Sequence, residues 1–169
     1  MKKIIYILLL FIVCFGINAC EKDDICVDGN TPLLVIRFYD NTTDVETFKA
    51  PPNLRVSGQL TPDTFGAIIP NTAVDSIQLP LRIEALSTTF SLTTNTTTDV
   101  ANDNEDILNF TYTTREFFVS RACGFIVYYD TLLDNLTVEG NGDSNWIKRI
   151  EIVNDTIENQ NAAHVKIFH

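Results

Sequence analysis

Two hydrophobic patterns follow one another along the chain. Residues 4–15 are almost entirely apolar, whereas the chain beyond position 30 has short apolar segments separated by polar residues. Apolar and polar residues alternate over residues 77–84, which predicts a strand with one buried face. Pro80 cannot donate a hydrogen bond to a neighbouring strand, so we expect this strand at a sheet edge or a bulge. Leu33–Tyr39 is apolar apart from one arginine and predicts a central strand.

The remaining apolar segments also resemble strands rather than helices, because no segment has sustained helical periodicity. They lie at residues 53–60, 89–93, 107–113, 116–121, 124–131, 136–139, 146–153 and 164–168. Gly140–Asp143 lies between two of them and predicts a hairpin. Residues 93–106 are polar and predict a long exposed loop. The pattern favours an all-β fold: a single antiparallel β-sandwich domain over residues 26–169, with a small β-barrel as the alternative.

The N-terminal apolar run has the features of a lipoprotein signal peptide. Two lysines precede it, and it is shorter than the about 20 residues that a transmembrane helix needs. The segment Ile17-Asn18-Ala19-Cys20 resembles the bacterial sequence at which a cysteine is acylated and becomes the mature N-terminus. We therefore predict a cleaved signal peptide over residues 1–19 and lipidation at Cys20, which anchors the chain to a membrane.

Residues 20–25 form the predicted lipid-anchored acidic linker. Its segment Glu21-Lys22-Asp23-Asp24 resembles the signal that directs Bacteroidetes lipoproteins to the outer face of the outer membrane. A solvated acidic run is the alternative interpretation. We expect an outer-membrane lipoprotein, with exposure at the cell surface favoured over the periplasmic face.

Charge and cysteine content narrow the possible functions further. The chain of 169 residues has 22 acidic and 12 basic side chains, and this formal charge of -10 argues against a nucleic-acid partner. In an exported chain with Cys20 acylated, Cys26 and Cys123 remain outside the signal and predict a disulfide. Zinc ligands or two buried thiols are the alternatives. With His164 and His169 as the two histidines, a zinc site is disfavoured, and we expect both histidines to be solvent-exposed.

The short linker predicts that the domain sits close to the membrane. Five residues separate Cys20 from Cys26. Fully extended, they span roughly 17 Å.

Three groups of residues are candidates for chemistry, and each has a structural interpretation. The acidic run at residues 102–106 could offer oxygens to calcium, but a solvated loop is favoured. Ser120 lacks a neighbouring histidine, which disfavours a nucleophile. The aromatic residues Tyr128, Tyr129 and Trp146 could stack on a sugar, although core packing is favoured for large aromatic side chains. The sequence therefore predicts no catalytic residues, no metal site and no cofactor.

Several stretches together resemble an uncharacterised lipoprotein family of Bacteroidetes (Flavobacteria-type), a domain of unknown function. They are Cys20-Glu-Lys-Asp-Asp-Ile-Cys26, Leu34-Val-Ile-Arg-Phe-Tyr-Asp40, Ser120-Arg-Ala-Cys-Gly124 and His164-Val-Lys-Ile-Phe168. The resemblance implies lipid at Cys20 and supports pairing of Cys26 with Cys123, but it implies no activity.

Two functions remain as hypotheses. The first is a non-enzymatic binding or assembly module for another envelope protein. The second is a lipoprotein that binds a glycan or small ligand at the cell surface through the three aromatic residues.

Overall fold

The computed structural model describes Cys26 and residues 29–96, 102–137 and 145–169. The predicted signal peptide, the lipidation site, the acidic linker and the predicted hairpin at residues 140–143 lie outside the described residues. Two compact units divide the chain. The tip unit comprises Cys26, Gly29 and Phe118–Phe125 among the described residues, and the main unit comprises the described parts of residues 30–117 and 126–169.

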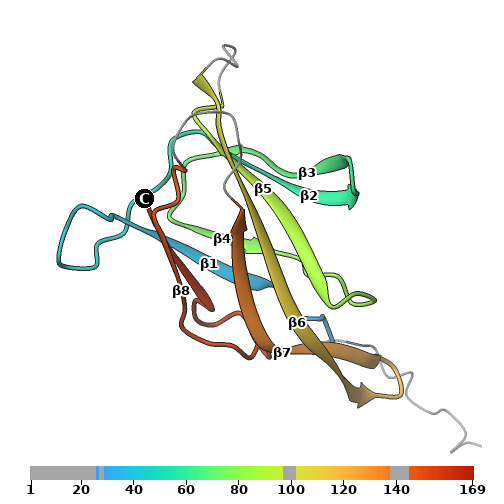
Figure 1. Cartoon of the computed structure of the whole chain (residues 1–169). Coiled ribbons are helices and arrows are strands. Elements are labelled where there is room, and N and C mark those ends of the chain that lie inside the picture. The colour runs from blue at the N-terminus through green and yellow to red at the C-terminus, as the bar shows by residue number, and fades with distance from the viewer. Residues whose placement is uncertain (1–25, 27–28, 97–101, 138–144) are drawn as a thin grey trace, which may run out of the picture. The chain divides into compact units, whose positions relative to one another are not determined.

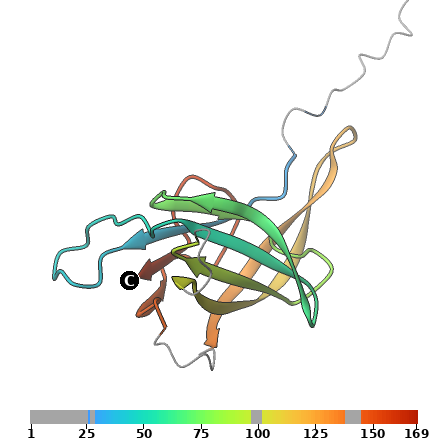
Figure 2. The ribbon, with the colours of Figure 1, turned by 90° about the horizontal axis from the view of Figure 1, so that it is seen from above.

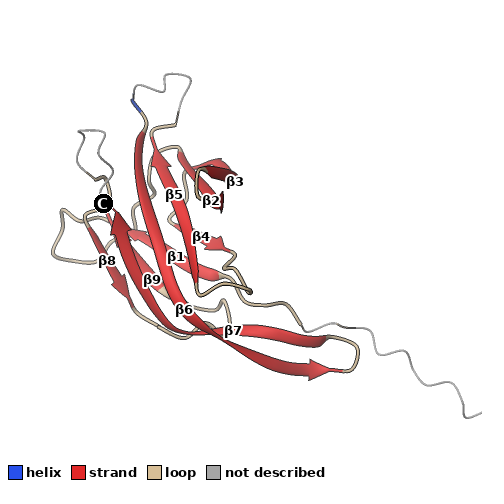
Figure 3. Ribbon diagram, turned by 45° about the vertical axis from the view of Figure 1, so that its right-hand side comes forward, coloured by secondary structure: helices blue, strands red, loops and turns tan. Residues whose placement is uncertain are grey.

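The described residues form nine strands and no α-helix, so the predicted all-β fold is confirmed, although the sequence pattern does not predict the strand at residues 64–72. The strands form two sheets rather than a closed barrel (Figures 1 and 3). Their bounds are β1 Leu34–Tyr39, β2 Leu54–Thr61, β3 Thr64–Thr72, β4 Ser76–Leu79, β5 Ser87–Thr94, β6 Asn104–Ser120, β7 Gly124–Thr137, β8 Arg149–Ile152 and β9 Val165–Phe168.

The four-stranded sheet has the order β4-β1-β9-β8. Strand β1 pairs antiparallel with β4 and parallel with β9, so the prediction of a central strand over Leu33–Tyr39 is confirmed. Its residues Leu34, Ile36 and Phe38 are fully buried. The strand predicted over residues 77–84 is shorter than expected, because β4 ends at Leu79 and Pro80 directly follows it. Strand β4 does lie at the sheet edge, as the missing backbone donor predicts.

The five-stranded sheet has the order β3-β2-β5-β6-β7. Strand β2 pairs antiparallel with β3 and β5, and β5 pairs antiparallel with β6 over eight residue pairs. The strands predicted at residues 107–113 and 116–121 are one strand, β6, because no turn-forming residue interrupts them. The strands predicted at residues 124–131 and 136–139 similarly belong to β7.

The prediction of an exposed loop over residues 93–106 is wrong at both ends. Thr93 and Thr94 are buried in β5, and Asp106 is buried in β6. The Asp106 carboxylate accepts a hydrogen bond from the Ile147 backbone N–H at 2.8 Å. A polar sequence is stable there because its polar groups find partners inside the protein.

One hydrophobic core joins the two sheets. Its fully buried members include Leu34, Ile36 and Phe38 from β1, and Phe90 and Phe110 from the five-stranded sheet. This arrangement is the predicted β-sandwich. The loop of residues 40–53 leaves the end of β1 and projects to one side in two views (Figures 1 and 2).

Candidate functional site

Core packing, the interpretation that the sequence favours for the three aromatic residues, holds for two of the three rings. Tyr129 is 0% exposed and Trp146 is 9% exposed. The Tyr129 hydroxyl donates to the Leu81 carbonyl at 3.0 Å, and the Trp146 indole N–H donates to the Leu92 carbonyl at 3.0 Å. Tyr128 is half-buried and stacks on Phe117, with 5.3 Å between the ring centroids. The polar atoms of the buried rings are satisfied, so these side chains cannot present a face to a sugar.

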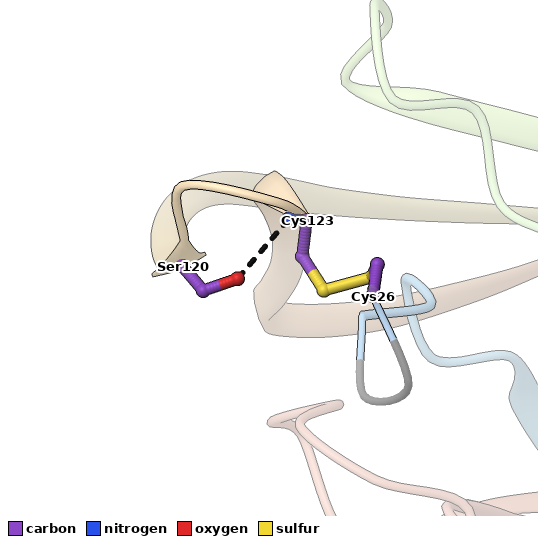
Figure 4. Close-up of a disulfide and its surroundings, with 3 residues drawn as sticks. All are labelled: Cys26, Ser120 and Cys123. Carbon is purple, nitrogen blue, oxygen red and sulfur yellow. Dashed lines mark hydrogen bonds between the residues drawn. A yellow bond between two sulfur atoms is a disulfide. The ribbon is translucent and has the colours of Figure 1, made fainter. Parts of the chain in front are cut away.

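The predicted disulfide between Cys26 and Cys123 is present in the tip unit (Figure 4). The two Cα atoms are 4.9 Å apart. Ser120, considered above as a nucleophile, accepts a hydrogen bond from the Cys123 backbone N–H at 3.1 Å. Gly29 passes so close that a Cβ there would lie 3.0 Å from the Cys123 Cβ and from both sulfur atoms. These four residues build a compact crosslinked turn.

Both histidines are less exposed than predicted. His164 is 2% exposed, and its Nδ1 accepts a hydrogen bond from the Val35 backbone N–H at 3.0 Å. His169 is half-buried and contacts Phe38 and Trp146 edge-to-face. Burial lowers the pKa of each imidazole, so the neutral form is favoured. Their place near the end of the sequence misled the prediction, because β9 is an interior strand of its sheet.

The acidic run at residues 102–106 does not build a metal centre among the residues that the structure describes. Asp103 forms an ion pair with Arg55 at 3.3 Å. Asp106 is buried under the Ile147 backbone, as described above.

A polar groove lies on the outer face of the four-stranded sheet. It has a volume of about 490 Å³, and its floor is formed by the side of β1 that faces away from the core, together with β4. Residues 160–163 form a wall. Its lining residues are Val35, Arg37, Tyr39, Ser76, Gln78, Gln160, Asn161, Ala162 and Ala163. Amide and hydroxyl groups of this kind both donate and accept hydrogen bonds, which suits a ligand rich in hydroxyl groups.

Arg37 gives the polar groove a positive charge. Its guanidinium carbon lies 4.6 Å from the centroid of the Phe48 ring, and the structure gives it no carboxylate partner among the described residues. Phe48 is held beside β1 by an isolated antiparallel bridge to Tyr39. A guanidinium stacked on an aromatic face keeps its N–H groups free at the edge, where they can bind a carboxylate in a forked geometry.

A second cation on this face is already paired with a carboxylate. Lys166 lies opposite Arg37 in the β1–β9 register, and its Nζ is 2.7 Å from Glu46 Oε2. The hydrogen bond that Lys166 donates to the Glu46 carboxylate raises the pKa of Lys166 and keeps it charged. Of these two neighbours, Arg37 is therefore the one available to an incoming anion.

His164 helps to hold the wall of the polar groove. Besides accepting from Val35, it donates its own backbone N–H to the Val35 carbonyl at 2.9 Å. A hydrogen bond to the Asn159 backbone acts on the same imidazole. These contacts tie the segment before residues 160–163 to β1, which lies on the floor.

A second, apolar groove of about 320 Å³ lies along the β2–β3 hairpin. Its lining includes Leu60, Ile68, Pro80 and Phe90. Leu60 is 63% exposed, and the neighbouring Phe65 is also exposed. Exposed apolar side chains that gather around one groove are typical of a protein-binding surface.

Sequence reasoning did not find either groove. The sequence pattern places Arg37 in a strand, and the lining residues outside that strand come from segments far apart in the chain. The arginine inside the apolar segment Leu33–Tyr39 was the available indication, because a charged residue in a central strand needs a specific environment.

Comparison with protein families shows a match over residues 53–169 to a family of unknown function, DUF6452. Comparisons with curated proteins and with solved structures found no match. Within the described ranges, no helix is long and apolar enough to cross a membrane.

Proposed function

Because the chain belongs to the family DUF6452, for which no function is known, we propose a function from the site itself. We propose that the protein is a non-catalytic lipoprotein of the outer membrane that binds an acidic, hydroxyl-rich ligand in the polar groove. Acidic oligosaccharides are the ligand class that this groove fits best. The observation that carries the proposal is the Arg37 guanidinium, which lines a groove rich in amide groups and has no carboxylate partner among the described residues.

The size and chemistry of the polar groove support this ligand class. Its volume of about 490 Å³ lies within the range of pockets that bind small ligands. Gln78, Gln160 and Asn161 can each donate and accept hydrogen bonds with sugar hydroxyl groups. Arg37 would bind the acidic group of the ligand and so give the groove specificity for acidic over neutral sugars. The chain itself contains many carboxylates.

The proposed location rests on the sequence of the N-terminus. The two lysines, the apolar run and Cys20 match the pattern of an acylated bacterial lipoprotein. The acidic residues after Cys20 favour display at the cell surface, where oligosaccharides are accessible. The family resemblance to Bacteroidetes lipoproteins agrees with this location.

Binding to acidic and neutral oligosaccharides tests the proposal. We expect the full chain to bind uronic-acid-containing oligosaccharides more tightly than matched neutral ones in isothermal titration calorimetry. Arg37→Gln should weaken acidic-sugar binding by at least about tenfold, because a charge-assisted hydrogen bond is lost. The affinity of the wild-type protein should also fall with added salt.

Arg149→Gln is the matched control. Arg149 lies on the same sheet and stacks on Phe168, with its guanidinium carbon 3.5 Å from the ring centroid, but it does not line the polar groove. Its substitution should leave the affinity unchanged. The proposal is overturned if wild-type protein binds no acidic sugar, or if both substitutions have the same effect.

A protein partner in the cell envelope is the second candidate function. The observation that favours it is the apolar groove of the β2–β3 hairpin, with Leu60 and Phe65 exposed beside it.

A further inference from the structure

The tip unit carries two exposed aromatic side chains beside its disulfide. Phe118 is 53% exposed and Phe125 is 65% exposed. Their rings contact each other with centroids 5.2 Å apart and an interplanar angle of 62°. Phe118 lies near the end of β6 and Phe125 near the start of β7, so the pair flanks the turn that contains Cys123.

The composition of this segment differs from that of the chain as a whole. Residues 118–125 read Phe-Val-Ser-Arg-Ala-Cys-Gly-Phe and contain no acidic side chain, whereas the chain has a formal charge of -10. Arg121 is the ionised residue of the segment and is exposed. Aromatic side chains with a nearby cation are typical of protein segments that rest in the headgroup region of a bilayer.

The disulfide limits how far this segment can lie from the proposed lipid anchor. Cys123 is bonded to Cys26, and five residues separate Cys26 from Cys20. Those residues span at most roughly 17 Å when fully extended. The polar region on each side of a bilayer is about 5–8 Å deep. An acylated Cys20 would therefore keep the crosslinked turn within reach of the lipid headgroups.

From this we propose that the tip unit is a second membrane contact, in which Phe118 and Phe125 insert into the lipid interface beside the acyl anchor. The inference rests on the proposed lipidation of Cys20. We propose a lipid surface as the binding partner of this exposed apolar pair, because the covalent path from the pair to the anchor is short. Insertion would fix the tip unit at the membrane at two points, so the chain would not pivot freely about its lipid.

Tryptophan fluorescence in lipid vesicles tests this contact. The acylated full chain is placed in vesicles of phosphatidylethanolamine and phosphatidylglycerol, with or without bromine atoms on the acyl chains. Phe118→Trp adds an indole at the proposed contact, and Phe125→Trp is a second variant in case the first does not fold. We expect the emission of the added indole to shift to shorter wavelength and to lose about half its intensity in brominated lipid, because it lies at the acyl-chain boundary.

Three controls make the outcome decisive. The buried Trp146 of the unsubstituted chain reports whether the fold is intact and should not be quenched. Phe65→Trp places an exposed indole in the main unit, and quenching there as strong as at position 118 would overturn a contact that is specific to the tip unit. Replacing Cys26 and Cys123 by serine should reduce quenching of the indole at position 118, because the covalent path to the anchor is lost.

Different results would contradict the lipid anchor and the second membrane contact. Absence of acyl mass at Cys20 in the protein isolated from its native membrane overturns the lipid anchor and this inference together. An acylated, folded chain whose indoles at positions 118 and 125 both remain unquenched overturns this inference and leaves the anchor standing.

Discussion

His164 connects β1 to the wall of the polar groove through hydrogen bonds, one of which needs a neutral imidazole. Its Nδ1 must carry a lone pair to accept the Val35 N–H at 3.0 Å. Protonation at Nδ1 would replace that acceptor with a donor and would place a charge in a site that is 2% exposed. Burial accordingly lowers the pKa of His164, and it also lowers the pKa of the half-buried His169.

We expect acid to destabilise the protein through these histidines. Because the folded-state pKa of His164 lies below its unfolded value of 6.5, the unfolded chain binds the proton more readily. The stabilisation is fully present above pH 6.5 and is lost as the pH falls below that value toward the folded-state pKa. The slope reaches at most about 1.4 kcal/mol per pH unit for each histidine.

Urea unfolding between about pH 5 and 8 measures this dependence. His164→Gln should make the free energy of unfolding depend less on pH, because glutamine can accept the Val35 hydrogen bond without titrating. His169→Gln should reduce the pH dependence by a separate amount. Asp40 does not interfere in this range, because hydrogen bonds from Thr42 lower its pKa to about 2. A wild-type stability that stays constant down to about pH 5 contradicts the prediction.

The strands show which features of a fold are local in sequence and which are not. The alternation of apolar and polar residues and the apolar runs predicted the positions of β1 and β4, because the burial of one or both faces of a strand determines which neighbouring residues are apolar. The breaks predicted within β6 and β7 were wrong. No turn-forming residue interrupts β6, and β7 stays paired in its sheet past Asp134 and Asn135. The polar groove could not be predicted, because Arg37, Gln78 and Asn161 meet only through strand order and a distant loop.

The β2–β3 hairpin is the element on which a protein partner would dock. Strand β3 lies at the edge of its sheet, and its pairing with β2 contains register shifts, which bend an edge away from simple strand addition. Contact through the side chains around the apolar groove is therefore favoured over extension of the sheet. We expect a photo-crosslinking amino acid at Leu60 to capture a specific envelope protein in living cells.

The control for this experiment is the same amino acid at Leu133, which is equally exposed but lies on β7. A band that forms at position 60, and disappears when Ile68 is replaced by Glu, supports docking at the apolar groove. Crosslinks of equal strength and identity at positions 60 and 133 contradict it.

At the scale of the whole molecule, Trp146 links the two sheets. Its indole N–H bonds to Leu92 in the five-stranded sheet, and its ring lies 6.2 Å from that of Phe38 in the four-stranded sheet. The chain contains a single tryptophan, so its fluorescence reports the junction of the sheets directly. Separation of the sheets would expose it to water.

We expect the two sheets to unfold together, because they share one core. Urea curves followed by Trp146 fluorescence and by far-ultraviolet circular dichroism should therefore coincide. Trp146→Phe should lower the free energy of unfolding by about 1–3 kcal/mol, since the Leu92 carbonyl would lose its partner. Tyr128→Phe is the control and should have little effect, because Tyr128 is half-buried. Transitions at clearly different urea concentrations would contradict a shared core.

The parallel pairing of β1 with β9 has a consequence for the order in which a newly made chain can fold. Synthesis proceeds from the N-terminus, so β1 emerges before β2 to β8, and its neighbour β9 follows all of them. Until then one edge of β1 has no permanent partner, and Leu34, Ile36 and Phe38 lack part of their cover. Strands β2, β3, β5 and β6 can meanwhile pair with one another in antiparallel order. The nascent chain would therefore expose its most hydrophobic strand until β9 is synthesised. Chains with such exposed apolar strands depend on chaperones that bind unfolded segments.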